Sequence, residues 1–294
     1  AKKNGKKLYK FKKIKINHKD TKNFKKLLFD DLKKQLDQYK KKIRQEFLRT
    51  SDGSLNVGLN VILIDSMLIE IINNTYQHIF RNIDFKLSII AVGGYGRGEL
   101  APYSDLDLLF LIPEDLNKTE TKNIEALIKL ILYLLWDLGY TVGHSTRTIL
   151  DCIKKSKLDL TVATSLLEKR FIAGNEQNFD LLNSKFNSFI SNSKTLNFVE
   201  EKLKEADLRH KKFGGSRYVV EPNVKDGKGG LRDLHTLIWI SKFAYKVDSI
   251  SKLIKMGAFS KNEALTFAEA QRFLLSVRCH LHYRAEREDD RLAM

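Results

Sequence analysis

The stretch LSIIAVGGYGRGELAPYSDLDLLFLIPED, residues 87–115, contains the features that decide the fold. An apolar segment runs into a turn with four glycines in six residues, and a second apolar segment follows a short spacer. The second segment begins with Asp105 and Asp107 at alternate positions, which we call the acid pair. Because the side chains of a strand alternate between its two faces, both carboxylates are expected on one face, with leucines on the other. The stretch therefore predicts a strand, a glycine turn and a second strand that bears two acids.

The acid pair and the glycine turn together indicate a site for a metal ion and a phosphate. Neighbouring carboxylates repel each other, and a divalent cation relieves that repulsion. Mg²⁺, or Mn²⁺ in its place, prefers oxygen ligands and commonly shares its shell with substrate phosphates. Gly93 and Gly94 let backbone N–H groups approach a phosphate, while Ser104 offers a hydroxyl and Arg97 a positive charge. These parts predict metal-assisted phosphoryl or nucleotidyl transfer, with the acid pair as metal-binding and catalytic residues.

The charge of the chain is concentrated at its N-terminus. The 294 residues carry a net charge of +16, but residues 1–50 contain 19 Lys and Arg against 5 Asp and Glu. The other 244 residues are therefore close to neutral, and a basic groove for nucleic acid is not expected through the fold. The two cysteines form neither a disulfide framework nor a zinc motif, and no signal peptide or membrane span is evident. This composition predicts a cytoplasmic protein with no membrane partner. The lysine-rich tail can serve either as a solubilising extension, which we favour, or as a contact for nucleic acid or another anionic surface.

The pattern along the chain predicts an α+β protein, with a small nucleotide-binding core followed by an all-helical domain. Helices are expected at 23–49, 59–81 and 119–138, and strands at 86–92, 105–112 and 140–149. From about residue 159 onward the pattern is helical, apart from a loop near 214–230. The expected units are a basic flexible tail at 1–22, N-terminal helices at 23–82, a core at 83–172 and a helical domain at 173–294 that contains the 214–233 loop.

Three segments carry a resemblance to a known family. They are AVGGYGRGELAPYSDLDLLFL (91–111), GYTVGHSTRTILDCIKKSKLDLTVATSLLEKRFIAGN (139–175) and VVEPNVKDGKGGLRDLHTLIWI (219–240). The first resembles the signature of the polymerase-β-like nucleotidyltransferases, in which a glycine pair precedes a short helix and a strand with two metal-binding aspartates. Together the three are similar to the bacterial [protein-PII] uridylyltransferase/uridylyl-removing enzymes. The resemblance implies transfer of UMP from UTP to a tyrosine of the PII signalling protein, with release of pyrophosphate.

The resemblance also implies domains that this chain does not show. The full-length enzymes of the family carry an HD-type phosphohydrolase domain and paired ACT regulatory domains, whereas the dipeptide His-Asp occurs nowhere among the 294 residues. We therefore expect the chain to be a fragment or a shortened homologue that attaches UMP without removing it.

The segment EPNVKDGKGGLRDLH, residues 221–235, is the second informative region. Its glycines favour a tight loop, and Lys225 and Arg232 supply positive charge just before an apolar helix. Backbone N–H groups at such a helix start can face an anion. The loop is expected either to fold over the core and bind the nucleotide or to serve as a structural hinge between the two parts.

A third carboxylate, which many nucleotidyltransferases of this type place on the next strand, is missing from GYTVGHSTRTIL, residues 139–150. The candidates that remain for a third acid or a general base are Asp159, which opens the following helix, and His144. Two other functions stay open at this stage. One is adenylyl transfer to a metabolic enzyme, and the other is a nucleotide-sensing module without turnover.

Overall fold

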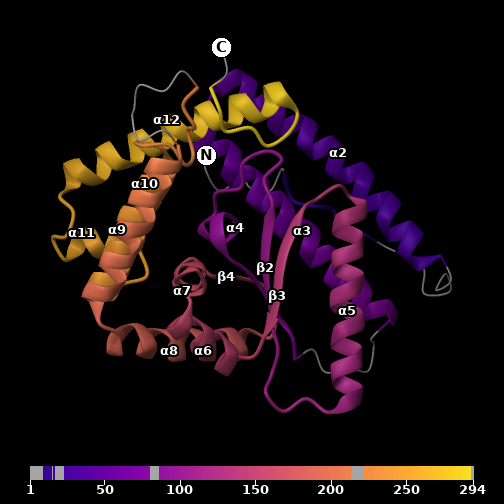
Figure 1. Ribbon diagram of the computed structural model, residues 1–294. Helices are drawn as coiled ribbons and strands as arrows, with labels where there is room; N and C mark the ends of the chain where they lie inside the picture. Colours follow the sequence, from indigo (N-terminus) through magenta and orange to yellow (C-terminus); the bar gives the residue numbers. More distant parts are fainter. Residues whose placement is uncertain (1–8, 15, 17–22, 80–85, 214–220, 293–294) are drawn as a thin grey trace.

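The computed structural model describes residues 9–14, 16, 23–79, 86–213 and 221–292, and it confirms the α+β class (Figure 1). Most of the predicted tail at 1–22 and the first part of the predicted 214–233 loop lie outside the described residues. One four-stranded sheet lies among helices, with the helices of the second half of the chain gathered on one side of it (Figure 1).

The sheet has the strand order β3-β2-β1-β4. Its strands are β1 (Ser88–Ala91), β2 (Leu106–Leu111), β3 (Val142–Arg147) and β4 (Arg170–Gly174). β1 runs antiparallel to β2 and β4, and β2 runs parallel to β3. The first three strands lie where the sequence predicts them. β4 corrects the expectation of helix alone beyond residue 159, and it spans the expected domain boundary between residues 172 and 173.

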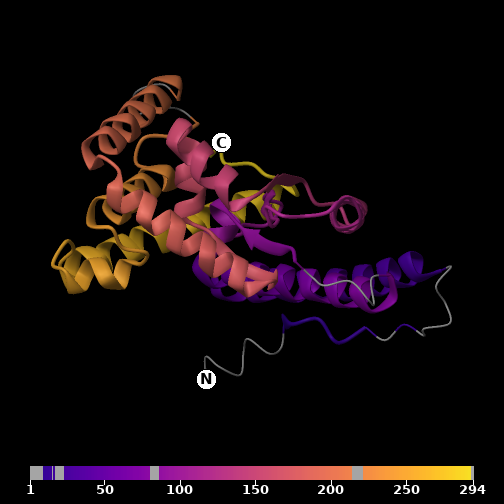
Figure 2. The ribbon, with the colours of Figure 1, turned by 90° about the horizontal axis from the view of Figure 1, so that it is seen from below.

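Two long helices precede the sheet, α2 (Phe24–Thr50) and α3 (Gly53–Ile79). They lie side by side along one side of the molecule (Figure 2). α3 begins six residues earlier than expected because Asp52 caps it, with its Oδ1 accepting a hydrogen bond of 3.0 Å from the Leu55 N–H. α3 is the one helix in the described residues long and apolar enough to cross a membrane, but 61% of that window is buried inside the protein.

The two faces of the sheet have different coverings. Leu106, Leu108 and Phe110 of β2 pack into a core with α2, α3 and α5 (Lys118–Asp137). On the opposite face, Leu109 and Leu111 pack with α6 (Ile149–Leu158), α7 (Leu160–Leu167) and α8 (Glu176–Asn192). This alternation along β2 follows the two-residue period of a strand. Asp107 lies on the same face of β2 as Leu109 and Leu111. It stands near the start of the strand, at the end that α6 and α8 leave open.

The remaining helices complete a frame around that open end. They are α4 (Gly93–Arg97), α9 (Thr195–Lys212), α10 (Leu231–Tyr245), α11 (Ile250–Lys255) and α12 (Lys261–Ala285). α12 returns to α3, and the contact is so close that a Cβ on Gly53 would lie 2.2 Å from the Ser276 backbone nitrogen. The N-terminal helices and the last long helix therefore form one packed layer.

Candidate active site

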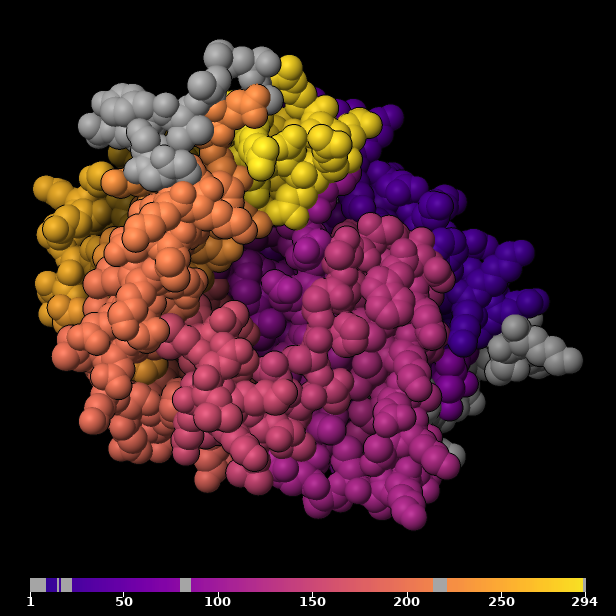
Figure 3. Space-filling view, viewed as in Figure 1, coloured from indigo at the N-terminus to yellow at the C-terminus, as the bar shows by residue number. Residues whose placement is uncertain are grey.

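A cavity of about 910 Å³ opens between the sheet and the helices of the second half of the chain. In the space-filling view it is the hollow between the orange helices and the pink segment that includes β3 (Figure 3). All the site residues predicted from the sequence line it except Asp159. They are Gly93, Gly94, Arg97, Ser104, Asp105, Asp107, His144, Lys225 and Arg232. The loop at 221–233 thus reaches the same cavity as the acid pair, although more than a hundred residues separate them.

The glycines around Asp107 keep its carboxylate accessible. Gly93 begins α4 with φ +59°, and a Cβ there would lie 2.7 Å from Asp107 Oδ2. Gly143 pairs with Asp107 across β2 and β3, and its Cβ would lie 2.6 Å from Asp107 Oδ1. A side chain at either position would have to displace the Asp107 carboxylate from this place. Sequence reasoning predicted Gly93 but missed Gly143, whose only signal is its place one strand away from the acid.

The carboxylates of the acid pair have no ion-pair partner among the residues that the structure describes. In the ranges that the structure describes, neither the Asp105 nor the Asp107 carboxylate accepts a hydrogen bond or forms an ion pair. Burial raises the pKa of Asp107, and the nearby charge of Asp105 raises it further. Lys225 and Arg232 act in the opposite direction from across the cavity. An exposed and a half-buried carboxylate that repel each other, in a space bordered by glycines, fit a divalent cation with oxygen ligands.

The comparisons with known proteins bear on this geometry. Residues 71–172 match the family described as nucleotidyltransferase domain, and residues 197–294 match the family described as GlnD PII-uridylyltransferase. The chain carries a nucleotidyltransferase domain. The first match contains the glycine turn, the acid pair and the strands that hold them, and the second contains Lys225 and Arg232. The cavity therefore lies between the two matched regions.

Three relatives extend these matches over most of the chain. Each is named bifunctional uridylyltransferase/uridylyl-removing enzyme. The protein of Rhodospirillum rubrum is 42% identical over 89% of this chain and 28% of its own length. The corresponding values are 44%, 85% and 27% for Azospirillum brasilense, and 46%, 76% and 24% for Novosphingobium aromaticivorans. The chain spans about a quarter of the length of these relatives. The matches confirm the resemblance seen in the three sequence segments and identify an enzyme.

Arg97 is held by carboxylates. Its largely buried side chain donates to Glu99 at 2.8 Å and pairs with Glu168 of the segment after α7. Glu168 also accepts a hydrogen bond of 2.6 Å from Trp239 Nε1 on α10, and Glu99 lies 2.9 Å from His235 Nε2 on the same helix. The Arg97 guanidinium is therefore directed into this network, which connects the glycine turn to α10. These contacts give Arg97 a positioning role, and because it also lines the cavity, its contact with the nucleotide stays a prediction.

The contacts among Arg97, Glu99 and His235 shift the pKa values of the two titratable side chains, Glu99 and His235. Burial alone would raise the pKa of Glu99, but Arg97 and His235 hold it lowered at about 2. Burial lowers the pKa of His235 to about 4, with Arg97 adding to the effect. His235 is thus neutral at pH 7, and it donates its Nε2 hydrogen to the Glu99 carboxylate.

Lys225 and Arg232 stand opposite the acid pair. Lys225 Nζ lies 2.9 Å from Glu288, and Arg232 Nε lies 3.2 Å from Asp226. Both are partly exposed toward the cavity. The loop is closed by its own backbone, because the N–H groups of Leu231 and Arg232 donate to the carbonyls of Val224 and Lys225. The structure therefore places two cations at fixed positions across the cavity from two uncompensated carboxylates.

The remaining predicted residues occupy different places. Ser104 Oγ lies 3.4 Å from the Arg278 guanidinium at the edge of the cavity. Asp159 caps α7, where its Oδ1 accepts from the Thr161 N–H at 2.7 Å, and this hydrogen bond lowers its pKa. The ring of His144 lies 6.3 Å from that of Trp136, on the face of the sheet opposite to Asp107. His144 lines the cavity from that opposite face, whereas Asp159 is not among the lining residues, and a role of either as third ligand or base stays a prediction.

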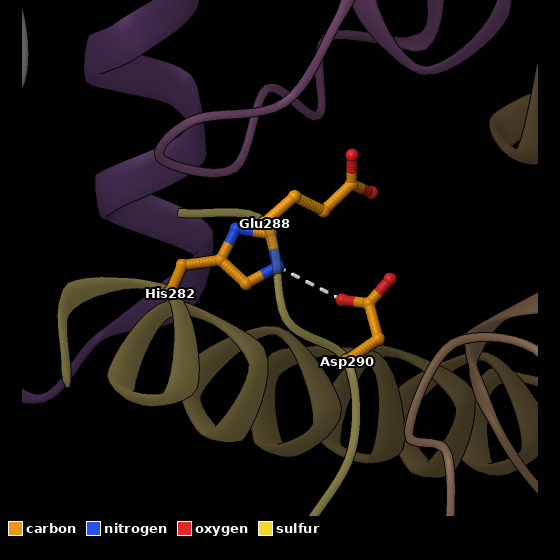
Figure 4. A group of neighbouring side chains, drawn as sticks. All are labelled: His282, Glu288 and Asp290. Atoms are coloured by element: carbon orange, nitrogen blue, oxygen red, sulfur yellow. Dashed lines mark hydrogen bonds and ion pairs between the residues drawn. The ribbon is translucent and has the colours of Figure 1, made fainter. Parts of the chain in front are cut away.

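A second acidic group lies near the cavity and differs from the acid pair. His282, Glu288 and Asp290 bring one ligand atom each within 4.8 Å of one another (Figure 4). Arg278 donates to Asp290 at 2.7 Å and to Glu288 at 3.0 Å. Both ring nitrogens of His282 face acceptors, namely the Pro102 carbonyl and Asp290. The carboxylates of Glu288 and Asp290 already have cationic partners. We therefore interpret these three residues as an ion-pair cluster and not as a metal site.

Proposed function

We propose that the chain transfers UMP from UTP to a tyrosine hydroxyl of a PII protein. The observation that carries the proposal is the arrangement of the cavity, in which the unpaired acid pair faces Lys225 and Arg232 across a space bordered by glycines. An acid pair suits a metal ion, and fixed cations suit phosphate oxygens. The match of residues 197–294 to GlnD PII-uridylyltransferase and the names of the relatives support UTP as donor and PII as acceptor.

Asp105 and Asp107 would hold Mg²⁺ or Mn²⁺. When bound, such an ion orients the phosphates and offsets the charge that develops on the departing pyrophosphate. The protein contributes position and charge. Gly93 and Gly94 border the phosphates with backbone alone, and Lys225 and Arg232 offset phosphate charge from the other side.

The reaction forms a bond between the tyrosine oxygen and the α-phosphorus and breaks the bond from that phosphorus to the pyrophosphate oxygen. The hydroxyl must also lose its proton. On the face of β3 that Asp107 shares stand Gly143, Ser145 and Arg147, so this strand offers no acid to receive it. We propose that water in the open cavity takes the proton. The enzyme then works mainly by positioning and electrostatic stabilisation, as is typical of phosphoryl transfer.

The cytoplasm is the compartment we propose, because UTP and the proposed acceptor both act there.

The test is incubation of the chain with a PII protein, Mg²⁺ and each of the four nucleoside triphosphates in separate reactions, followed by intact-mass measurement of the acceptor. We expect a gain of one UMP per acceptor subunit with UTP and none when the metal is chelated. A gain of AMP would replace the proposal with adenylyl transfer. Binding of UTP without any mass gain would identify a sensing module instead.

A further inference from the structure

The edge of the sheet beside the cavity has free hydrogen-bonding groups. β3 is the outermost strand of the order β3-β2-β1-β4. The Leu106 N–H donates to the Thr141 carbonyl, and the Ile112 N–H donates to the Arg147 carbonyl. The odd-numbered residues of β3 therefore direct their backbone toward β2. Because successive residues of a strand point their backbone groups to opposite sides, the even-numbered ones, Val142, His144 and Thr146, direct theirs outward.

No described residue pairs with these outward groups, and the strand is exposed. Gly143, His144 and Thr146 are all accessible to solvent, whereas every residue of β1 is buried. Natural proteins protect such edges with Lys, Pro or a bulge, since an open edge pairs readily with another chain. β3 reads VGHSTR, with one charge at its last position and neither Lys nor Pro. The edge is open to a pairing partner and borders the cavity, which Gly143, His144, Ser145 and Arg147 also line.

The geometry between this edge and the acid pair suits an incoming side chain. Gly143 lies between the open edge and Asp107, with no side chain of its own. A strand added beside β3 would lie about two strand spacings, roughly 10 Å, from β2. Its side chains on the Asp107 face would pass over Gly143 into the cavity. A long side chain with a terminal hydroxyl spans much of this distance.

An aromatic surface adjoins the same edge on the opposite face. Tyr133 and Trp136 of α5 are 58% and 44% exposed, and their ring centroids lie 5.6 Å apart. The His144 ring continues the patch at 6.3 Å from Trp136. In strand addition, main-chain hydrogen bonds supply affinity and surfaces for alternate side chains supply specificity. Exposed Tyr and Trp are typical of protein interfaces.

We propose that the edge of β3 is the docking strand for the protein acceptor. An extended segment of the acceptor adds to the sheet, passes its tyrosine over Gly143 toward Asp107 and rests the neighbouring side chains on the patch of Tyr133, Trp136 and His144. This inference rests on the proposed function, and it names the surface through which the acceptor is recognised.

The first test is hydrogen exchange of the 294-residue chain with and without a PII protein, in the presence of a UTP analogue with a methylene bridge between the α- and β-phosphorus. We expect the amides of Val142, His144 and Thr146 to exchange at least tenfold more slowly in the complex. Binding without added protection of these amides would overturn the inference. Concentration-dependent dimers of the chain that protect the same amides would also overturn it, because the edge would then pair with itself.

The second test compares Thr146→Pro with Thr146→Ala. Both lose the threonine side chain, but only proline lacks the outward N–H, and an edge strand tolerates it. We expect Thr146→Pro to raise the KM for the acceptor about three- to tenfold, as the loss of one hydrogen bond predicts. Thr146→Ala should stay within twofold, and the Kd for UTP should be unchanged in both. Equal acceptor KM values in the two variants would contradict the inference.

A third variant covers the case in which Thr146→Pro does not fold. Trp136→Ala removes an exposed side chain and should raise the acceptor KM while leaving the Kd for UTP unchanged. An unchanged acceptor KM in this variant would overturn the aromatic half of the inference. The experiments also distinguish failure of the proposed transfer function from failure of the proposed docking strand. Protection of β3 by a PII protein that receives no UMP would refute the transfer function alone, and UMP transfer without protection would refute the docking strand alone.

Discussion

Two groups of carboxylates stand near the cavity, and they have opposite surroundings. Asp290 sits between Arg278 and His282 and is nearly enclosed, so every negative charge there meets a positive one. Asp105 and Asp107 share a strand end with no cationic partner among the described residues. Burial would raise the pKa of Asp290, but His282 and Arg278 hold it well below its usual range, whereas burial and Asp105 raise that of Asp107. For these carboxylates, pairing with cations indicates a structural role, and the lack of a described cationic partner indicates a site for a cationic ligand.

The strongest way to break this comparison is to neutralise the acid pair. Asp105→Asn combined with Asp107→Asn should reduce transfer by about 10³-fold or more, since the loss of a metal's charge stabilisation is worth several kcal/mol. The fold should persist, because the change removes repulsion. The measurement is the initial rate of UMP transfer, with Asp115→Asn in an exposed loop as the matched control. Near-normal turnover of the double variant with Mg²⁺ would show that the metal assignment is wrong.

The second prediction concerns stability and its pH dependence. Asp290→Asn should lower the free energy of unfolding at pH 7 by about 3 kcal/mol, because Arg278 and His282 are left buried without their partner. A folded pKa below the unfolded value near 4 means that the contribution of Asp290 is present above that value and is lost as the pH falls below it. The gap between variant and wild type should therefore shrink below about pH 4.

Asp107→Asn is the counterpart in the same urea-unfolding series between about pH 3 and 7. A folded pKa above the unfolded value means that Asp107 stabilises only while protonated, and this contribution is lost as the pH rises through the folded pKa. The variant should thus gain stability relative to wild type as the pH rises. The same sign of pH dependence for both variants would refute the distinction between the two groups.

The smallest expected effect comes from the glycine that clears the acid pair. Gly93→Ala and Gly139→Ala both place a Cβ on a residue with positive φ, so both should cost about 1 kcal/mol of stability. Only Gly93 has Asp107 within reach of that Cβ, while Gly139 has open space. We expect the Kd for UTP with Mg²⁺, measured by calorimetry, to rise roughly tenfold in Gly93→Ala alone. Equal affinities in the two variants would remove the argument for a cleared site.

The part of the molecule that could be predicted from sequence is the part with local signals. The glycine turn, the acid pair and the first two strands lie within about 30 positions of one another, and the third strand is indicated by its own residues at 140–149. β4 was missed because RFIAG is short and its pairing with β1 joins residues about 80 positions apart. Its neighbours along the chain are helical, so the local pattern favoured helix.

The site shows the same limit. The acid pair could be predicted because alternation along one strand determines its geometry. The ion pair between Arg97 and Glu168 could not be predicted, because the two residues are 71 positions apart and no local pattern indicates a buried carboxylate at residue 168. His144 and Asp159 were candidates by residue type. In the structure His144 lies on the face of the sheet opposite to Asp107, and the Asp159 carboxylate accepts a hydrogen bond as the cap of α7. Residue type identifies chemistry, and only the tertiary contacts decide which groups are free to perform it.

The close contact between α3 and α12 has a consequence for synthesis on the ribosome. α3 is the most apolar long helix described, and the face that meets Ser276 belongs to residues near Gly53. Translation adds on the order of 5–20 residues per second, so this face waits roughly 10–40 seconds for its partner helix to be made. During that interval the face of α3 near Gly53 is uncovered, while α2 is already made and can pack against another face of the helix. Factors that bind nascent apolar chains would meet α3 before α12 does, and the yield of folded protein should depend on them more than on the strength of the finished contact.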